Sequence, residues 1–287
     1  MMFEAFANAD YTRVTVGYVI MRIPLTVQWL RAAAGDPPRR RVARRYATGL
    51  VLTQIGWVAR LALPHSLGTA SFLVLVACEV AVPFWAERAG PMTPWHPEHI
   101  AERYGEFTLI VLGESVLSTM VAGKTSELSW ASVSGGGGAM LLLFGVWWIY
   151  FDPPGGSTIV VSERNSWLWG YGHLPIFAAV AALGAGLAVA AEVADGVGEI
   201  TAVGAAYCVA VPVAIYLVVL TELHQRATDG FSMRTRSLVK SLGILVVAAA
   251  AIWVSLPVTV LLMGLYFAAS LVDAALAGDR AALRAAA

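Results

Sequence analysis

The chain has 287 residues, of which 58% are hydrophobic and 13% are charged, and its 19 Lys and Arg balance its 19 Asp and Glu. A soluble domain usually carries about a quarter charged residues, so the composition excludes an ordinary soluble domain and predicts the lipid bilayer as the partner of most side chains. No Walker-type phosphate loop and no basic–aromatic stripe is found, so we expect no nucleic acid partner, and no motif predicts a cofactor or a metal.

Nine apolar segments are long enough to cross a bilayer, which takes about 20 residues per helix. They cover residues 11–31, 46–64, 66–86, 100–122, 136–152, 168–191, 200–221, 238–255 and 257–276. The last two are separated only by a short break at Pro257 and could instead form one kinked element. We therefore expect an all-α, polytopic transmembrane bundle of about nine helices, folded as a single transmembrane domain over residues 1–287.

The distribution of basic residues predicts the orientation of the bundle, because Lys and Arg concentrate in cytoplasmic loops. The segment that links the first two spans contains six arginines: Arg31, Arg39, Arg40, Arg41, Arg44 and Arg45. When this segment is placed in the cytoplasm, alternation along nine spans leaves only Lys124 in an outer loop. The sequence thus predicts an outer N-terminus and a cytoplasmic C-terminus.

Ionisable residues interrupt several of these segments. In chain order they are Arg22 in the first segment, Glu79 in the third, Glu102, Arg103, Glu106 and Glu114 in the fourth, Asp152 at the end of the fifth and His173 at the start of the sixth. The second segment has a polar but uncharged residue, Gln54, at its centre. A charge at the bilayer centre costs about 2.5–3.5 kcal/mol on insertion scales, so such side chains are expected to face the interior of the bundle and to find partners there.

The fourth segment carries the densest set of charges. With a rise of about 1.5 Å per residue, Glu106 lies about 9 Å and Glu114 about 21 Å from Ile100 along the helix axis. Arg103 is then close enough to pair with Glu106 or with His99, whereas Glu114 needs a partner on another helix, for which Arg22 has the matching depth. Two interpretations remain open: ion pairs that fix helix register, or a relay lining a hydrated cavity that opens to the cytoplasm.

Two further patterns flank this region. His96, His99 and Glu102 have a spacing that could align a metal on a helix, but Pro97 is typical of a first helical turn and favours a cap with interfacial histidines. The run Ser134 to Gly138, SGGGG, precedes the fifth segment and predicts a loose start of that helix, because glycine gives the backbone conformational freedom.

The stretch HIAERYGEFTLIVLGES, residues 99–115, resembles the signature H-x-x-E-R-[FY]-G-x-[FL]-x-[IL]-I-x-[IL]-G-E-[ST] of the bacterial low-temperature-requirement A (LtrA) membrane family. The early YVIMRI with Arg22, the later WWIYFD and the YGHLPIF with His173 are similar to further motifs of that family and follow the same order. Family members usually open with an E-L-F-[FY]-D-L-V-F-V helix, which is absent here, so the chain is expected to lack the family's N-terminal part. The resemblance implies a multi-pass protein of the bacterial cytoplasmic membrane and no settled biochemical activity.

These patterns favour transport of a proton, an ion or a small solute through a cytoplasm-facing polar cavity. Glu106 and Glu114 would titrate and Arg103 and Arg22 would act as counter-charges. Histidine, with an unperturbed pKa of about 6.5, would shuttle protons at the inner mouth through His99 and His173. The alternatives are an intramembrane enzyme acting on lipid or isoprenoid head groups, with Asp152 among its acid–base groups, and a non-catalytic sensor or scaffold. A homo-oligomer, or a partner that supplies the missing helices, is expected to complete the assembly.

Overall fold

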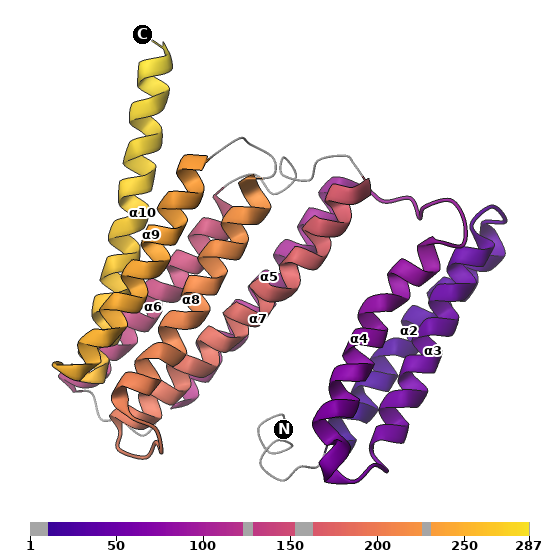
Figure 1. Cartoon of the computed structure of the whole chain (residues 1–287), viewed down its shortest axis with the longest axis horizontal. Helices are drawn as coiled ribbons and strands as arrows, with labels where there is room; N and C mark the ends of the chain where they lie inside the picture. Colours follow the sequence, from indigo (N-terminus) through magenta and orange to yellow (C-terminus); the bar gives the residue numbers. More distant parts are fainter. Residues whose placement is uncertain (1–10, 123–128, 153–162, 226–230, 287) are drawn as a thin grey trace. The chain divides into compact units, whose positions relative to one another are not determined.

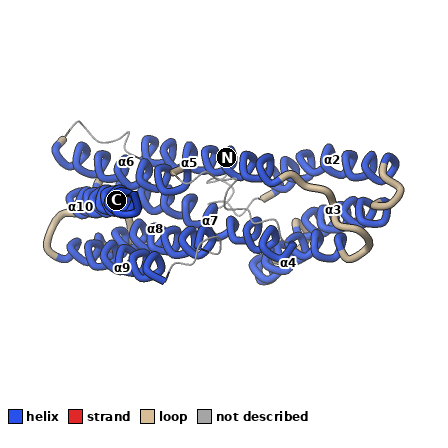
Figure 2. Tube along the Cα trace, turned by 90° about the horizontal axis from the view of Figure 1, so that it is seen from above, coloured by secondary structure: helices blue, strands red, loops and turns tan. Residues whose placement is uncertain are grey.

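A computed structural model of the chain describes residues 11–122, 129–152, 163–225 and 231–286. Every regular element within these ranges is helical (Figure 2), which confirms the predicted all-α class. The chain divides into two compact units, Met1–Trp95 and His96–Ala287, here called unit 1 and unit 2. Each unit is described by itself, so the single transmembrane domain stays a prediction. Lys124 lies outside the described residues.

Unit 1 consists of three long helices, shown in indigo to purple in Figure 1: α2 (Thr12–Gly35), α3 (Arg40–Arg60) and α4 (Gly68–Glu87), with the short 3₁₀ helix η1 (His65–Leu67) before α4. Helix α3 packs against both α2 and α4. Most of the arginines expected in the first loop belong to α3 instead, because arginine favours helix and its long side chain reaches water from a helix end. The loop itself is short, and Arg39 Nη1 closes it by donating to Asp36 Oδ2 at 3.0 Å.

Unit 2 contains six long helices: α5 (Pro97–Ala122), α6 (Trp130–Phe151), α7 (Glu163–Ala194), α8 (Ala202–Gln225), α9 (Phe231–Ala248) and α10 (Leu256–Ala286), with the 3₁₀ helix η4 (Ala249–Ile252) after α9. Helix α7 packs against α5 and α8, α8 also packs against α9, and α6 lies along α10 (Figure 1). The last two predicted segments are therefore separate helices and not one kinked element.

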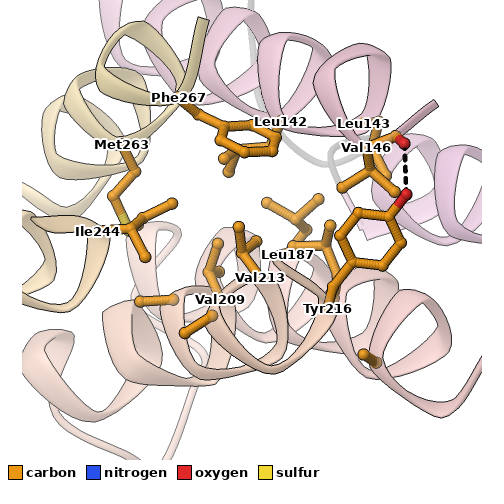
Figure 3. Close-up of a cluster of buried hydrophobic side chains, with 14 of the residues drawn as sticks. Leu142, Leu143, Val146, Leu187, Val209, Val213, Tyr216, Ile244, Met263 and Phe267 are labelled. Carbon is orange, nitrogen blue, oxygen red and sulfur yellow. Dashed lines mark hydrogen bonds between the residues drawn. The ribbon is translucent and has the colours of Figure 1, made fainter. Parts of the chain in front are cut away.

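The core of unit 2 is apolar. Leu142 and Val146 of α6, Val209 of α8 and Phe267 of α10 are fully or almost fully buried and meet in one cluster (Figure 3). A few hydrogen bonds join helices within this cluster; in the one drawn in Figure 3, the Tyr216 hydroxyl of α8 donates to the backbone oxygen of Val146 in α6 at 2.7 Å. Apolar side chains thus fill the space between the helices of this unit.

The glycine run lies inside α6 and does not form a loose helix start. Helix α6 begins at Trp130, and the Ser129 side chain caps it in a reciprocal pair with Ser132. A Cβ atom added at Gly138 would lie 2.5 Å from the backbone of Val260 and Leu261 in α10. Glycine is needed here because it lets the two helix backbones approach closely, so the expectation of a loose start is wrong.

Six of the described helical stretches are long and apolar enough to cross a membrane: Gly68–Glu87, Trp130–Phe151, Trp167–Ala194, Ala202–Leu223, Arg234–Ile252 and Leu256–Asp273. They support a multi-pass membrane protein. Helices α2, α3 and α5 are as long but are interrupted by the polar residues noted above, and they do not meet that criterion. The crossing of all nine helices and the outer N-terminus stay predictions.

Candidate functional site

An ion pair lies among the three helices of unit 1. Arg22 Nη2 of α2 is 3.1 Å from Glu79 Oε2 of α4. The hydroxyl of Tyr18, one turn before Arg22 in α2, accepts a hydrogen bond from Arg22 Nη2 and donates one to Glu79 Oε2. Tyr18 therefore bridges the two charged groups, and its ring also lies 4.8 Å from the guanidinium carbon of Arg22.

Helix α3 supplies two further donors to the same carboxylate. Gln54 Nε2 donates to Glu79 Oε1 at 3.1 Å, and the indole Nε1 of Trp57 donates to the same oxygen at 3.0 Å. Both oxygens of Glu79 thus accept two hydrogen bonds each, from two neighbouring helices. Tyr18, Arg22, Gln54, Trp57 and Glu79 form what we call the three-helix cluster.

The cluster is shielded from solvent but contains unused hydrogen-bonding capacity. The side chains of Arg22 and Glu79 are 25% and 17% exposed, and Gln54 is 9% exposed. Arg22 Nε and Gln54 Oε1 are buried, and neither has a hydrogen-bond partner among the described residues. A buried donor or acceptor without a partner costs about 1–3 kcal/mol, so two such atoms in one cluster need an explanation.

The charged pair of the cluster lies near the middle of its two helices. Glu79 is about 16 Å along the axis from the start of α4 at Gly68, given a rise of about 1.5 Å per residue, and α4 is apolar enough to cross a membrane. A charge at that depth is costly, and pairing with Arg22 makes the cluster neutral overall. The sequence-based expectation that Arg22 and Glu79 face inward and find partners agrees with this geometry.

The charges of the fourth predicted segment are arranged differently, on the exposed side of α5. Arg103 Nη1 lies 2.8 Å from Glu106 Oε2, which is the expected pairing at i+3, but the two side chains are 75% and 50% exposed. His99 Nδ1 lies 3.5 Å from Glu102 Oε2, and these side chains are more than half exposed as well. Glu114 is exposed and has no ion pair or hydrogen bond among the described residues.

Within unit 2, therefore, the charged side chains of α5 do not point toward the interior of the helix bundle, where they were expected. The buried face of α5 consists of Gly105, Thr108, Leu112 and Ser115. Ser115 packs against α7. Its hydroxyl donates to the backbone oxygen of Val180 at 3.1 Å, and a Cβ added at Gly184 would lie 2.6 Å from Ser115 Oγ. Small residues decide which face of α5 packs, since they allow close helix contact. Because Arg22 and Glu114 belong to different units, their pairing stays a prediction.

His173 of α7 is buried, at 3% exposure, in an aromatic environment. The rings of Tyr104, Trp169 and Phe177 lie 4.8, 4.2 and 5.7 Å from its ring, and its Nδ1 is 2.7 Å from the backbone oxygen of Trp169. Asp152, by contrast, is exposed at the C-terminal end of α6. Both residues belong to unit 2, and their proposed roles stay predictions.

No three His, Cys, Asp or Glu side chains lie close enough to hold a metal ion in the part of the chain that the structure describes. Helix α5 begins at Pro97, so His96 precedes the helix, as the proline predicts. The rings of His96 and His99 lie 4.9 Å apart. This arrangement agrees with interfacial histidines at a helix start.

Three members of the three-helix cluster were not among the predicted site residues: Tyr18, Gln54 and Trp57. The sequence analysis noted Gln54 only as a polar residue at the centre of its segment. Tyr18 precedes Arg22 by four residues and is therefore on the same face of α2, so the Y-x-x-x-R spacing did contain the signal. Trp57 follows Gln54 by three residues in α3, but an aromatic residue in an apolar helix is so common that the sequence alone does not distinguish it.

The comparisons with known proteins give one match. A model of the family described as "Bacterial low temperature requirement A protein (LtrA)" matches residues 1–276. No curated protein and no solved structure is significantly similar to the chain. The match covers nearly all of both units, including the helices of the three-helix cluster and the motif in α5. The chain is thus a multi-pass membrane protein that belongs to the bacterial low temperature requirement A (LtrA) family.

Proposed function

We propose that this protein moves protons across the membrane and that Glu79 is the group that binds and releases them. The observation that carries the proposal is the ion pair between Arg22 and Glu79, which is partly buried between three helices and bridged by Tyr18. An ionisable group inside a membrane helix is by default a candidate functional site, and ion and proton paths are among its known roles.

A purely structural role explains the cluster less well. Replacing a buried ion pair by apolar side chains of similar volume is often neutral or stabilising, because both charges must be desolvated. Five polar or aromatic side chains on three helices, two of which retain unpartnered atoms, are thus more than helix association requires. Proton transfer, by contrast, does require such an arrangement. The Glu79 carboxylate needs donors that stabilise its ionised form, and it needs a partner, Arg22, whose attraction weakens when the carboxylate is protonated.

The geometry supports a direct coupling between proton binding and helix contacts. Glu79 Oε2 accepts from both Tyr18 and Arg22, so a proton bound at that oxygen removes the charge that attracts Arg22. Arg22 is on α2 and Glu79 on α4, and Gln54 and Trp57 of α3 contact the other carboxylate oxygen. Protonation thus weakens contacts among all three helices at once, which is what a change of access from one side of the membrane to the other requires.

Glu106 and Glu114, the titrating groups expected from the sequence, are exposed on α5 within unit 2 and are weaker candidates. The proposal also places the protein in the bacterial cytoplasmic membrane. The description of the family as bacterial supports that location.

A proteoliposome assay tests the proposal. Purified protein is reconstituted in chloride buffer with an internal pH-sensitive dye, and either an imposed pH gradient or a potassium gradient with valinomycin is used to drive proton entry. We expect acidification of the lumen with the unaltered protein, loss of that signal with Glu79→Gln, and retention with the matched control Glu114→Gln. Each variant is checked for a monodisperse elution profile and a cooperative thermal transition.

Two outcomes would overturn the proposal. One is equal proton flux with Glu79→Gln and the unaltered protein; the other is the absence of flux under every gradient from a protein that is folded. Turnover of lipid or isoprenoid head groups by the same proteoliposomes would favour the intramembrane enzyme, and inertness in both assays would favour a sensor or scaffold.

A further inference from the structure

The carboxylate of Glu79 occupies a site that consists of hydrogen-bond donors. Its partners are the Tyr18 hydroxyl, Arg22 Nη2, Gln54 Nε2 and Trp57 Nε1, and each of them donates to a Glu79 oxygen. A set of convergent donors with one positive charge suits any small anion, because such donors stabilise negative charge wherever they are held in place. The Glu79 carboxylate therefore occupies a set of donors that has the chemistry of an anion-binding site.

Arg22 has donor capacity that Glu79 does not use. Arg22 contacts Glu79 through one nitrogen, Nη2, which also donates to the Tyr18 hydroxyl. Arg22 Nε is buried and has no hydrogen-bond partner among the described residues. A guanidinium has five N–H donors and no acceptor, so it can serve a second anion while one of its nitrogens contacts Glu79. Arg22 is therefore the natural contact for an anion that enters the cluster.

Gln54 offers what a protonated Glu79 would need. A carboxylic acid carries an O–H donor, and the groups around Glu79 are mostly donors themselves. Gln54 Oε1 is buried and has no partner, and the other end of the same amide already contacts Glu79 Oε1. Rotation of this amide presents Oε1 to the new O–H group, so both unpartnered atoms of the cluster acquire a role when the proton binds.

Charge balance links the two events. With Glu79 ionised and Arg22 charged the cluster is neutral; a bound proton alone leaves it at +1 and a bound anion alone leaves it at −1. Either net charge is costly inside the membrane. A proton and a monovalent anion bound together keep the cluster neutral, and this joint uptake is the state of lowest electrostatic cost.

We propose that a small monovalent anion displaces Glu79 from the donors of the three-helix cluster while Glu79 takes up one proton, so that proton and anion bind together in a ratio of one to one. The proton moves from water to a Glu79 carboxylate oxygen, the anion takes the donors of Arg22, Tyr18 and Trp57, and no covalent bond other than the O–H bond forms or breaks. This inference rests on the proposed function, since it names the second substrate of the same site.

Chloride binding to the purified full-length protein in detergent micelles tests the inference without any transport step. Chloride is titrated into gluconate buffer at several pH values between 5 and 8, and binding is followed by calorimetry and by tryptophan fluorescence. Because one proton is linked to each anion, we expect the affinity to fall about tenfold for each pH unit above the pH at which Glu79 ionises in the free protein. The matched control Arg88→Gln changes an exposed arginine of the same unit and should leave this dependence unchanged.

Two variants make the test sharper. Glu79→Gln mimics the protonated form, so we expect chloride to bind this variant with an affinity that no longer depends on pH. The double variant Arg22→Gln/Glu79→Gln removes both charges, leaves no unpaired ion to disturb folding, and should not bind chloride at any pH.

Several results would overturn the inference: no chloride binding by the folded protein at any pH, binding that does not change with pH, or unchanged binding by the double variant. The proposed function fails in a different way. Proton flux without chloride binding would contradict the anion site and leave the proton path in place, whereas proton-linked chloride binding without flux would contradict transport and leave the anion site in place.

Discussion

In unit 1 the charged side chains of Arg22 in α2 and Glu79 in α4 lie between the helices, whereas in unit 2 the charged side chains of α5 lie on the face away from that unit's apolar core. The apolar residues show the opposite pattern. In the apolar stretch of α4 only 11% of the residues are buried, compared with 56% in the apolar stretch of α8. Large hydrophobic side chains of α2 and α4, such as Ile20 and Leu73, are about 60% exposed.

The difference shows two ways of joining helices where lipid is the solvent. Lipid tails are as apolar as leucine, so apolar contact alone gives little preference for a protein neighbour, and helices associate through close packing or through hydrogen bonds. Unit 2 relies on close packing at small residues such as Gly138 and Ser115. Unit 1 concentrates hydrogen bonds on one carboxylate, and only that arrangement can change with a proton.

The largest expected effect is the loss of one partner of the ion pair in unit 1. We expect Glu79→Leu to lower the free energy of unfolding by about 3 kcal/mol or more, because it leaves Arg22 charged and unpaired among the helices. The double variant Arg22→Met/Glu79→Leu should recover most of that loss. Reversible unfolding with sodium dodecyl sulfate in mixed micelles measures both values, and equal destabilisation by the single and double variants would contradict the account.

A second, smaller effect tests the close packing of unit 2. Gly138→Ala should lower the free energy of unfolding by about 1–3 kcal/mol, because the added methyl group meets the backbone of α10. Gly136→Ala is the matched control in the same glycine run, since a Cβ there meets nothing within 4 Å; we expect it to be neutral or stabilising by up to about 1 kcal/mol through helix propensity. Equal effects at both positions, in the same unfolding assay, would show that α6 does not approach α10 as described.

The smallest effect concerns the exposed pair of α5. In a double-mutant cycle with Arg103→Ala and Glu106→Ala, we expect a coupling energy of about 0.5 kcal/mol or less, as is typical of an exposed i, i+3 pair on a helix. Raising the salt concentration should reduce it further. A coupling energy above about 2 kcal/mol would mean that this pair is buried in the functional protein, and it would remove the contrast between the two regions.

Much of the fold could be predicted from the sequence, because an apolar segment of about 20 residues predicts a membrane-spanning helix. All nine predicted segments correspond to helices, whereas the boundaries near Arg40 and Trp130 shift, since arginines and capping serines continue a helix beyond its apolar part. The inward position of Arg22 and Glu79 followed from the cost of charge in lipid.

The partners in the candidate site were harder to predict. The depth of Arg22 suggested Glu114, a pairing between two units that stays a prediction. The partner of Arg22 within unit 1, Glu79, was not predicted, because depth along a helix does not specify which neighbouring helix faces a side chain. The orientation of α5 was missed for a related reason: the segment is apolar on most sides, and small residues on its partner helix, such as Gly184, decide which face packs. Single-sequence periodicity does not report a contact that depends on two helices.

The most direct test of the central claim is proton flux through the double variant Arg22→Met/Glu79→Leu in proteoliposomes. This variant leaves no unpaired charge in the three-helix cluster, so we expect it to fold with nearly normal stability and to conduct no protons. Proton flux at the level of the unaltered protein would contradict the assignment of the three-helix cluster as the proton site.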